Sequence, residues 1–278
     1  MMKILFLFGF LSCFWACRSN PKTFEEKPTQ KVADFDIFEN ITKFDTTTKT
    51  IHILVSLCDN LYQGIVPVSM SLGNGQNPSS NLYWGAGFGV KTYFKKSKSW
   101  TLLKTEKGSY PILERLVFKH KTKPFYIVAD AYDGQHILKC TKDLLYSCSA
   151  QKRDTIHVQN KTLGIYGNAK MVAYIGHNGL MDFSLKDKFG NIDKKSRDCI
   201  VLACNSKPYF KDYFKTLKTN AFLWTTGLMC PEAYSLHDAL DAYIAGKSKS
   251  EIHLEASKAY AKYQKCNLKA AKNLIVAN

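Results

Sequence analysis

Short apolar runs alternate with segments of helical spacing along most of this 278-residue chain. The apolar runs are rich in β-branched residues and end at turn formers, which is typical of buried strands in a parallel sheet. They cover residues 50–57, 99–105, 125–129, 170–176, 199–203 and 221–226. Apolar positions three and four residues apart predict helices over residues 82–94, 111–120, 134–149, 209–217, 235–245 and 249–275. This alternation predicts an α/β fold with a mostly parallel, doubly wound sheet and flanking helices.

Two of the predicted strands end on residues that carry chemistry. Met171–Gly179 is an apolar run that ends on His177 beside glycines, and Asp198–Ser206 is a second run that ends on Cys204 and small polar residues. If the two strands are neighbours, His177 and Cys204 lie side by side at their carboxyl ends, the edge where α/β sheets bind ligands. A thiol next to an imidazole is the minimal equipment for nucleophilic catalysis.

These two residues have complementary roles in that chemistry. A neighbouring imidazole and a helix N-terminus favour the thiolate, and Asn205-Ser206-Lys207-Pro208 is expected to open a helix after Cys204. His177 then protonates the leaving group and activates water. The backbone N–H groups of Gly179 and Cys204 are the candidate oxyanion donors. The alternative is structural, with His177 closing a turn and Cys204 packed in the sheet.

The two motifs resemble those of the caspase-like clan of cysteine peptidases, which includes legumains, gingipains, clostripains and separases. Val201-Leu202-Ala203-Cys204-Asn205-Ser206 is similar to the clan's hydrophobic strand ending in Cys, and His177-Asn178-Gly179 to its His-Gly motif with Asn178 interposed. In organisation the likeness covers residues 50 to 246. It implies a caspase-like three-layer sandwich over residues 50–278 and a cysteine peptidase or related acyl hydrolase. Peptide or protein would be the substrate, with no cofactor.

The resemblance also implies residues that line the substrate site. The segment after the first strand and the strand after the Cys border the substrate in this clan. The candidates are Asp59, Asn60, Asn205, Ser206, Thr225, Thr226 and Glu232. Each has a structural alternative, because polar residues at strand ends also form turns and cap helices.

The chain carries 39 basic and 23 acidic residues, a formal net charge of +16. Such an excess favours anionic partners such as lipid headgroups, polysaccharide or acidic protein. No arginine-rich run or base-stacking motif is present, so nucleic acid is not expected. Five lysines, spaced like one face of a helix, are a candidate contact with an anionic surface, the alternative being a solvated helix face. They are Lys258, Lys262, Lys265, Lys269 and Lys272.

The N-terminus resembles a bacterial lipoprotein signal. Ile4–Ala16 is an uncharged apolar stretch after a short basic start, too short to span a bilayer. Cys17 follows it directly and is the expected lipidation site, with Cys13 as a weaker competitor. We expect a signal peptide over residues 1–16, a polar tether over 17–49, and an envelope lipoprotein anchored in the membrane. Plain secretion is the alternative.

The other seven cysteines (nine minus Cys13 and Cys17) have no CxxC spacing and no accompanying histidine cluster, so no metal site is expected. In an oxidising envelope some of them are expected to pair, and an odd number leaves at least one thiol over, for which Cys204 is the candidate. The rival to the enzyme hypothesis is a non-catalytic surface lipoprotein that uses the α/β scaffold for binding or assembly.

The lipoprotein hypothesis makes a testable prediction. Cys17→Ala removes the atom that carries the lipid, so the variant should be released from membranes or keep its signal uncleaved. Membrane fractionation and the mass of the mature N-terminus measure this. A mature chain that starts elsewhere, without lipid and soluble, would contradict the hypothesis.

Overall fold

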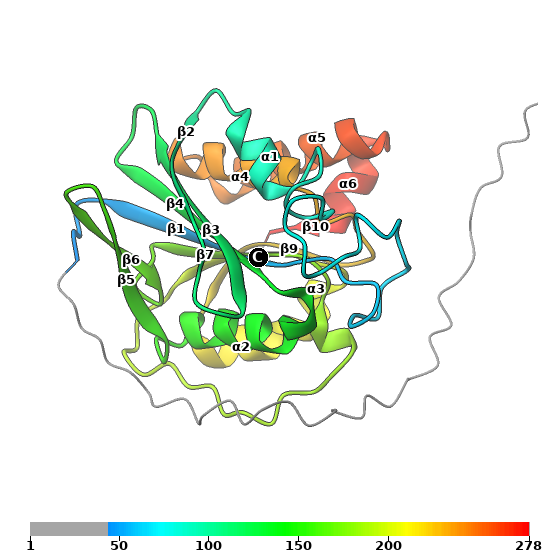
Figure 1. Ribbon diagram of the computed structural model, residues 1–278, viewed down its shortest axis with the longest axis horizontal. Coiled ribbons are helices and arrows are strands. Elements are labelled where there is room, and N and C mark those ends of the chain that lie inside the picture. Colours follow the sequence, from blue (N-terminus) through cyan, green and yellow to red (C-terminus); the bar gives the residue numbers. More distant parts are fainter. Residues whose placement is uncertain (1–43, 278) are drawn as a thin grey trace, which may run out of the picture. The chain divides into compact units, whose positions relative to one another are not determined.

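The computed structural model describes residues 44–277 (Figure 1). The predicted signal over residues 1–16, the lipidation candidate Cys17 and the tether as far as residue 43 lie outside the described residues. Within residues 44–277, no helix combines the length and apolar character needed to cross a bilayer.

A mixed eight-stranded sheet, mostly parallel, forms the centre of the domain, in the order β10-β9-β8-β7-β1-β4-β3-β2. Strands β9, β8, β7, β1 and β4 are parallel, and β10, β3 and β2 add antiparallel edges. The strands are β1 (Lys49–Ser56), β2 (Trp100–Glu106), β3 (Ile112–His120), β4 (Phe125–Tyr132), β7 (Met171–Ile175), β8 (Asp198–Leu202), β9 (Asn220–Thr225) and β10 (Ile275–Val276). A separate hairpin consists of β5 (Arg153–Val158) and β6 (Lys161–Tyr166).

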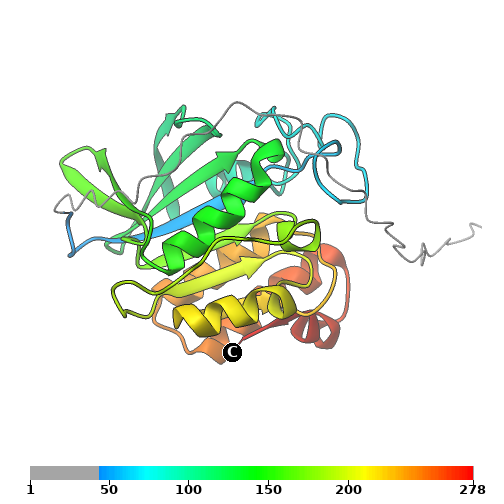
Figure 2. The ribbon, with the colours of Figure 1, turned by 90° about the horizontal axis from the view of Figure 1, so that it is seen from below.

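Helices cover both faces of this sheet (Figures 1 and 2). The core on one face includes residues of α1 (Val90–Lys95), α4 (Ala233–Ile244), α5 (Lys249–Gln264) and α6 (Leu268–Leu274). The core on the other face includes residues of α2 (Ile137–Cys148), α3 (Ser206–Leu217) and the β5–β6 hairpin. Because both faces are covered, β1 is buried on both sides, with Ile53 in the first core and Leu54 in the second. This burial explains why the central strands are continuous apolar runs. The predicted α/β class with a mostly parallel sheet is confirmed.

The helix predicted over residues 111–120 is wrong, because this segment is strand β3. Its Leu116 and Phe118 face one core and Val117 faces the other, which is the two-residue period of a strand. Pairing with β2 and β4 favours this period over the helical one. The helix predicted over 82–94 is also wrong for most of its length. Only α1 forms, from Val90 onward, after a segment of turns rich in glycine.

The single helix predicted over residues 249–275 is two helices, α5 and α6. Lys265 ends α5 in a left-handed conformation, with φ +52°, and the Asn267 side chain accepts from the Ala270 N–H to start α6. The five lysines of the predicted stripe are therefore divided between two helices and the turn that joins them. All five are exposed, and their contact with an anionic surface stays a prediction.

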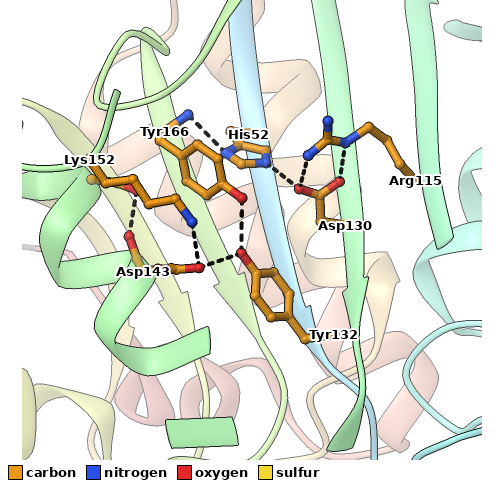
Figure 3. Close-up of polar contacts among 8 residues, drawn as sticks. His52, Arg115, Asp130, Tyr132, Asp143, Lys152 and Tyr166 are labelled. Atoms are coloured by element: carbon orange, nitrogen blue, oxygen red, sulfur yellow. Dashed lines mark hydrogen bonds and ion pairs between the residues drawn. The ribbon is translucent and has the colours of Figure 1, made fainter. Parts of the chain in front are cut away.

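A layer of polar side chains crosses the sheet on the α2 side (Figure 3). Asp130 on β4 is fully buried and accepts two hydrogen bonds from the Arg115 guanidinium on β3, at 2.6 and 2.7 Å. Its Oδ2 lies 2.9 Å from Nε2 of the fully buried His52 on β1. The backbone N–H of Tyr166 donates to His52 Nδ1 at 3.0 Å. Since Nδ1 accepts, Nε2 carries the proton and donates to Asp130, so His52 is neutral.

The same layer continues into α2. The Tyr132 hydroxyl donates to Asp143 at 2.9 Å and lies 3.2 Å from the Tyr166 hydroxyl. Lys152 and Lys139 form ion pairs with Asp143, which is almost fully buried. The layer thus joins three adjacent strands, the β5–β6 hairpin and α2 through buried polar groups that satisfy one another.

Burial and the ion pair act in opposite directions on this layer. Burial alone would raise the pKa of Asp130 and lower that of Arg115, but their contact outweighs burial, so the pKa of Asp130 is lowered and that of Arg115 is raised. For His52 burial is the larger effect, and its pKa falls below the usual 6.5 despite Asp130.

The neutral His52 predicts a loss of stability in acid. The unfolded chain takes up a proton at this residue below about pH 6.5 and the native state does not, so the stabilisation present above pH 6.5 is lost as the pH falls toward the lower native pKa. The limiting slope is about 1.4 kcal/mol per pH unit. His52→Gln keeps a donor and an acceptor but does not titrate. Urea unfolding between pH 7.5 and 5.5 should therefore show a smaller pH dependence in the variant than in the wild type. Equal slopes would contradict the assignment.

Candidate functional site

Strands β7 and β8 are parallel neighbours, with Ile175 opposite Leu202. The Gly176 N–H donates to the Leu202 carbonyl at 3.4 Å, which continues the pairing past the end of β7. The chain therefore brings His177 and Cys204 to adjoining carboxyl ends, as predicted. Asn178 joins the two segments directly, because its Nδ2 donates to the Cys204 carbonyl at 2.8 Å.

A bend at Gly176 directs the chain into the histidine turn. Gly176 has φ +148°, and a Cβ there would lie 2.8 Å from the Ser56 carbonyl oxygen of β1. Only glycine combines this backbone conformation with such a close approach. The Tyr174 hydroxyl, from the end of β7, donates to the His177 carbonyl at 2.6 Å. Asn178 then caps the short turn η2 (Gly179–Met181). Each of these contacts limits where the imidazole can lie.

The imidazole itself is held by a carboxylate. His177 is only 5% exposed, and its Nε2 lies 2.8 Å from Asp182 Oδ2. The Gly64 N–H, from the loop after β1, donates to the same oxygen at 2.9 Å. Since a carboxylate accepts, the bonded Nε2 carries the proton and Nδ1 is the nitrogen with an available lone pair.

Cys204 lies just beyond β8, partly buried against the core that contains α1 and α4, and it is in no disulfide. The Met229 N–H donates to its Sγ at 3.3 Å, and Sγ lies 3.5 Å from the Met229 carbonyl oxygen. Asn205 follows in a left-handed conformation, and α3 begins at Ser206, as the sequence predicts. A backbone N–H donor thus lies next to sulfur, and α3 begins two residues after Cys204. Cys199 lies in the opposite core and faces away.

Asp59 and Asn60, predicted to line the substrate site, order the loop that follows β1. Asp59 is 1% exposed and accepts from the N–H groups of Leu61 and Tyr62, at 2.9 and 3.2 Å. The Asn60 side chain exchanges two hydrogen bonds with the backbone of Val68. These contacts match the turn-forming alternative.

Ser206 and Thr225 are fully buried between β8 and β9. The Thr225 N–H donates to Ser206 Oγ at 2.8 Å, and Ser206 Oγ donates to the Val201 carbonyl at 2.8 Å. Thr225 Oγ1 also donates to the Ala203 carbonyl. These side chains thus connect the start of α3 to both strands from inside the protein.

The outer edge of β9 is occupied by the chain itself. Strand β10 pairs with Trp224 and Thr225, and the exposed Thr226 donates its N–H to the Leu274 carbonyl at 2.9 Å. An extended peptide that pairs with this edge has to displace β10.

Glu232 precedes α4 and accepts at Oε2 from the Tyr234 hydroxyl and Gln264 Nε2, at 3.1 and 3.3 Å. Burial raises the pKa of its carboxyl group. Asn205 is half-buried and makes no side-chain capping bond to α3. Gly179 is buried at the start of η2, where a Cβ would meet the Phe183 ring, and its role as an oxyanion donor stays a prediction.

Sequence reasoning did not identify Asp182 or Met229. An acidic residue five positions after His177 was a visible signal for the first, although only the fold shows which carboxylate reaches the ring. Met229 acts through its backbone, so its side chain gave no signal. Within residues 44–277, no group of three or more His, Cys, Asp or Glu side chains is arranged to hold a metal ion.

The chain matches no protein-family model, and comparison with the curated proteins and with the solved structures gives no significant match. The geometry of the site therefore carries the functional argument by itself.

The bend at Gly176 makes a prediction about stability. Gly176→Ala should lower the free energy of unfolding by about 1–3 kcal/mol, because alanine is strained at this φ and its Cβ meets Ser56. Gly190→Ala is the matched control, since nothing lies within 4 Å of a Cβ there, and it should stay within about 0.5 kcal/mol of wild type. Equal losses in urea unfolding would show that the bend is not constrained.

Proposed function

We propose that this chain is a cysteine peptidase, or a related acyl hydrolase, in which Cys204 is the nucleophile and His177 the general base and acid. One observation carries the proposal: the pairing of β7 with β8 brings His177, whose imidazole bonds Asp182, and Cys204, whose Sγ accepts from the Met229 N–H, to adjoining strand ends. A base oriented by a third group next to a nucleophile is the arrangement that acyl transfer needs.

The order of the parallel strands supports this location. From β1 the chain passes to β4 on one side, and from β4 it crosses to β7 on the other, so the switch point lies between β1 and β7. Open α/β sheets bind ligands at the carboxyl ends of the strands at such a point. The His177 turn and the loop after β1 flank it. Together with the helices on both faces, this order supports a caspase-like three-layer sandwich as part of the proposal.

The proposed reaction has two half-reactions. The Cys204 thiolate attacks the substrate carbonyl carbon, the tetrahedral intermediate collapses to a thioester, and the protonated His177 gives its proton to the departing amine or alcohol. Neutral His177 then takes a proton from water, whose oxygen attacks the thioester and releases the acid product and Cys204. The N–H groups of Gly179 and Cys204 are the proposed donors to the oxyanion. The reaction requires no cofactor.

A non-catalytic binding protein is the second candidate. Two observations favour it. Ser206 and Thr225 are buried and bonded inside the protein, so solvent does not reach them. The edge of β9 at Thr225 and Thr226 already bonds the chain itself, so it is not open to a peptide. A protein of this kind keeps its Cys204 and His177 as packing residues only.

Substitution separates the two candidates. Cys204→Ala and His177→Ala should each abolish hydrolysis of labelled casein, because a nucleophile and its base act as a unit. Each should keep the free energy of unfolding within about 1–2 kcal/mol of wild type. Cys199→Ala is the control, since Cys199 is fully buried in the opposite core. It should cost stability and leave turnover unchanged. If activity follows stability equally in Cys199→Ala and Cys204→Ala, both thiols are packing residues and the enzyme proposal is wrong.

A further inference from the structure

We infer that Asp182, held by the backbone of Gly64, is a positioning residue that fixes the reactive nitrogen of His177 and stabilises its protonated form. The inference rests on the proposed function and extends it from two residues to a linked unit. It also connects the base to the loop that follows β1, on the other side of the switch point.

The contacts define this unit closely. Asp182 Oδ2 lies 2.8 Å from His177 Nε2 and 2.9 Å from the Gly64 nitrogen, which is 118 residues away in the sequence. The two side chains are only 5% and 14% exposed, so solvent and salt screen their interaction weakly. A Cβ at Gly64 would overlap Asp182 Oδ1. A side chain at position 64 would therefore push the carboxylate away from its present position.

The protonation of the imidazole follows from this position. Because Asp182 accepts from Nε2–H, Nδ1 is the nitrogen that exchanges a proton with Cys204. Transfer of the thiol proton to Nδ1 gives a thiolate and an imidazolium, and the positive charge then lies against the Asp182 carboxylate. Removing that carboxylate should make the ion pair less favourable, so that the thiolate forms only when the thiol ionises by itself at higher pH.

The test follows thiolate formation directly and needs no substrate. Iodoacetamide alkylates thiolates, and peptide mass spectrometry resolves the rate at Cys204 from the rates at the other cysteines. In Asp182→Asn the rate at pH 6 should fall at least about 10-fold, while the rate at pH 10 stays within about twofold of wild type. A variant that only disturbs packing changes access to the sulfur at both pH values.

Two further variants sharpen the result. Asp187→Asn is the matched control, the same substitution in the same loop, because Asp187 bonds Tyr146 and Lys142. It should leave both rates unchanged. Gly64→Ala retains the carboxylate but displaces it, and should lower the rate at pH 6 like Asp182→Asn. Because the two residues act through one contact, the double variant should lose little more than either single variant.

Failure of this inference differs from failure of the proposed function. If His177→Ala suppresses alkylation at pH 6 and Asp182→Asn does not, the positioning role is wrong and the Cys204–His177 proposal stands. If Asp182→Asn lowers the alkylation rate at Cys204 equally at pH 6 and pH 10, Asp182 is only a structural contact, and the inference is also wrong. If His177→Ala itself leaves the wild-type profile unchanged, the proposed function is wrong.

Discussion

The buried carboxylate of Asp130 is the constraint on which the rest of the sheet depends. A charge removed from water is costly unless it is paired and hydrogen bonded, and removing one partner of such a pair costs about 3–5 kcal/mol. Asp130 meets this requirement with Arg115 from β3 and His52 from β1, which sets the register of three adjacent strands at one level (Figure 3). Hydrophobic contacts alone would tolerate a shift along the strands more readily, because apolar surface is not directional.

The packing of this sheet determines the geometry of the candidate site. Strand β1 is fixed against β4 by the polar layer and against β7 by its register. Its carboxyl end supplies the Ser56 carbonyl that Gly176 passes closely and, a few residues later, the Gly64 N–H that holds Asp182. The position of the imidazole is thus determined by a strand that carries neither proposed catalytic residue. Distant packing and the position of His177 are thus coupled through short backbone contacts.

The sequence predicted what depends on local periodicity and burial. The central strands and α2, α3 and α4 were recognisable because each buries side chains in a regular pattern, and a turn former follows most of them. Residues 112–120 were misassigned because Leu113, Leu116 and Val117 fit a helical spacing as well as a strand. The pairing with β2 and β4 decides between the two periods, and it is not visible locally. The hairpin of residues 153–166 was missed because its two six-residue strands mix polar and apolar residues, and β5 is mostly half-buried.

In the candidate site, too, the sequence predicted the features that depend on local pattern and missed those that depend on long-range contacts. The positions of His177 and Cys204 followed from two strands and the rule that neighbouring parallel strands end at one edge. Asp182 and Gly64 come together over 118 residues, and Met229 reaches sulfur through its backbone, so neither contact has a local signature. Ser206 and Thr225 show the converse limit: small polar residues after a strand look the same in the sequence whether they face a substrate or bond each other inside the protein. Composition identifies which atoms are available, and only the long-range fold decides which of them meet.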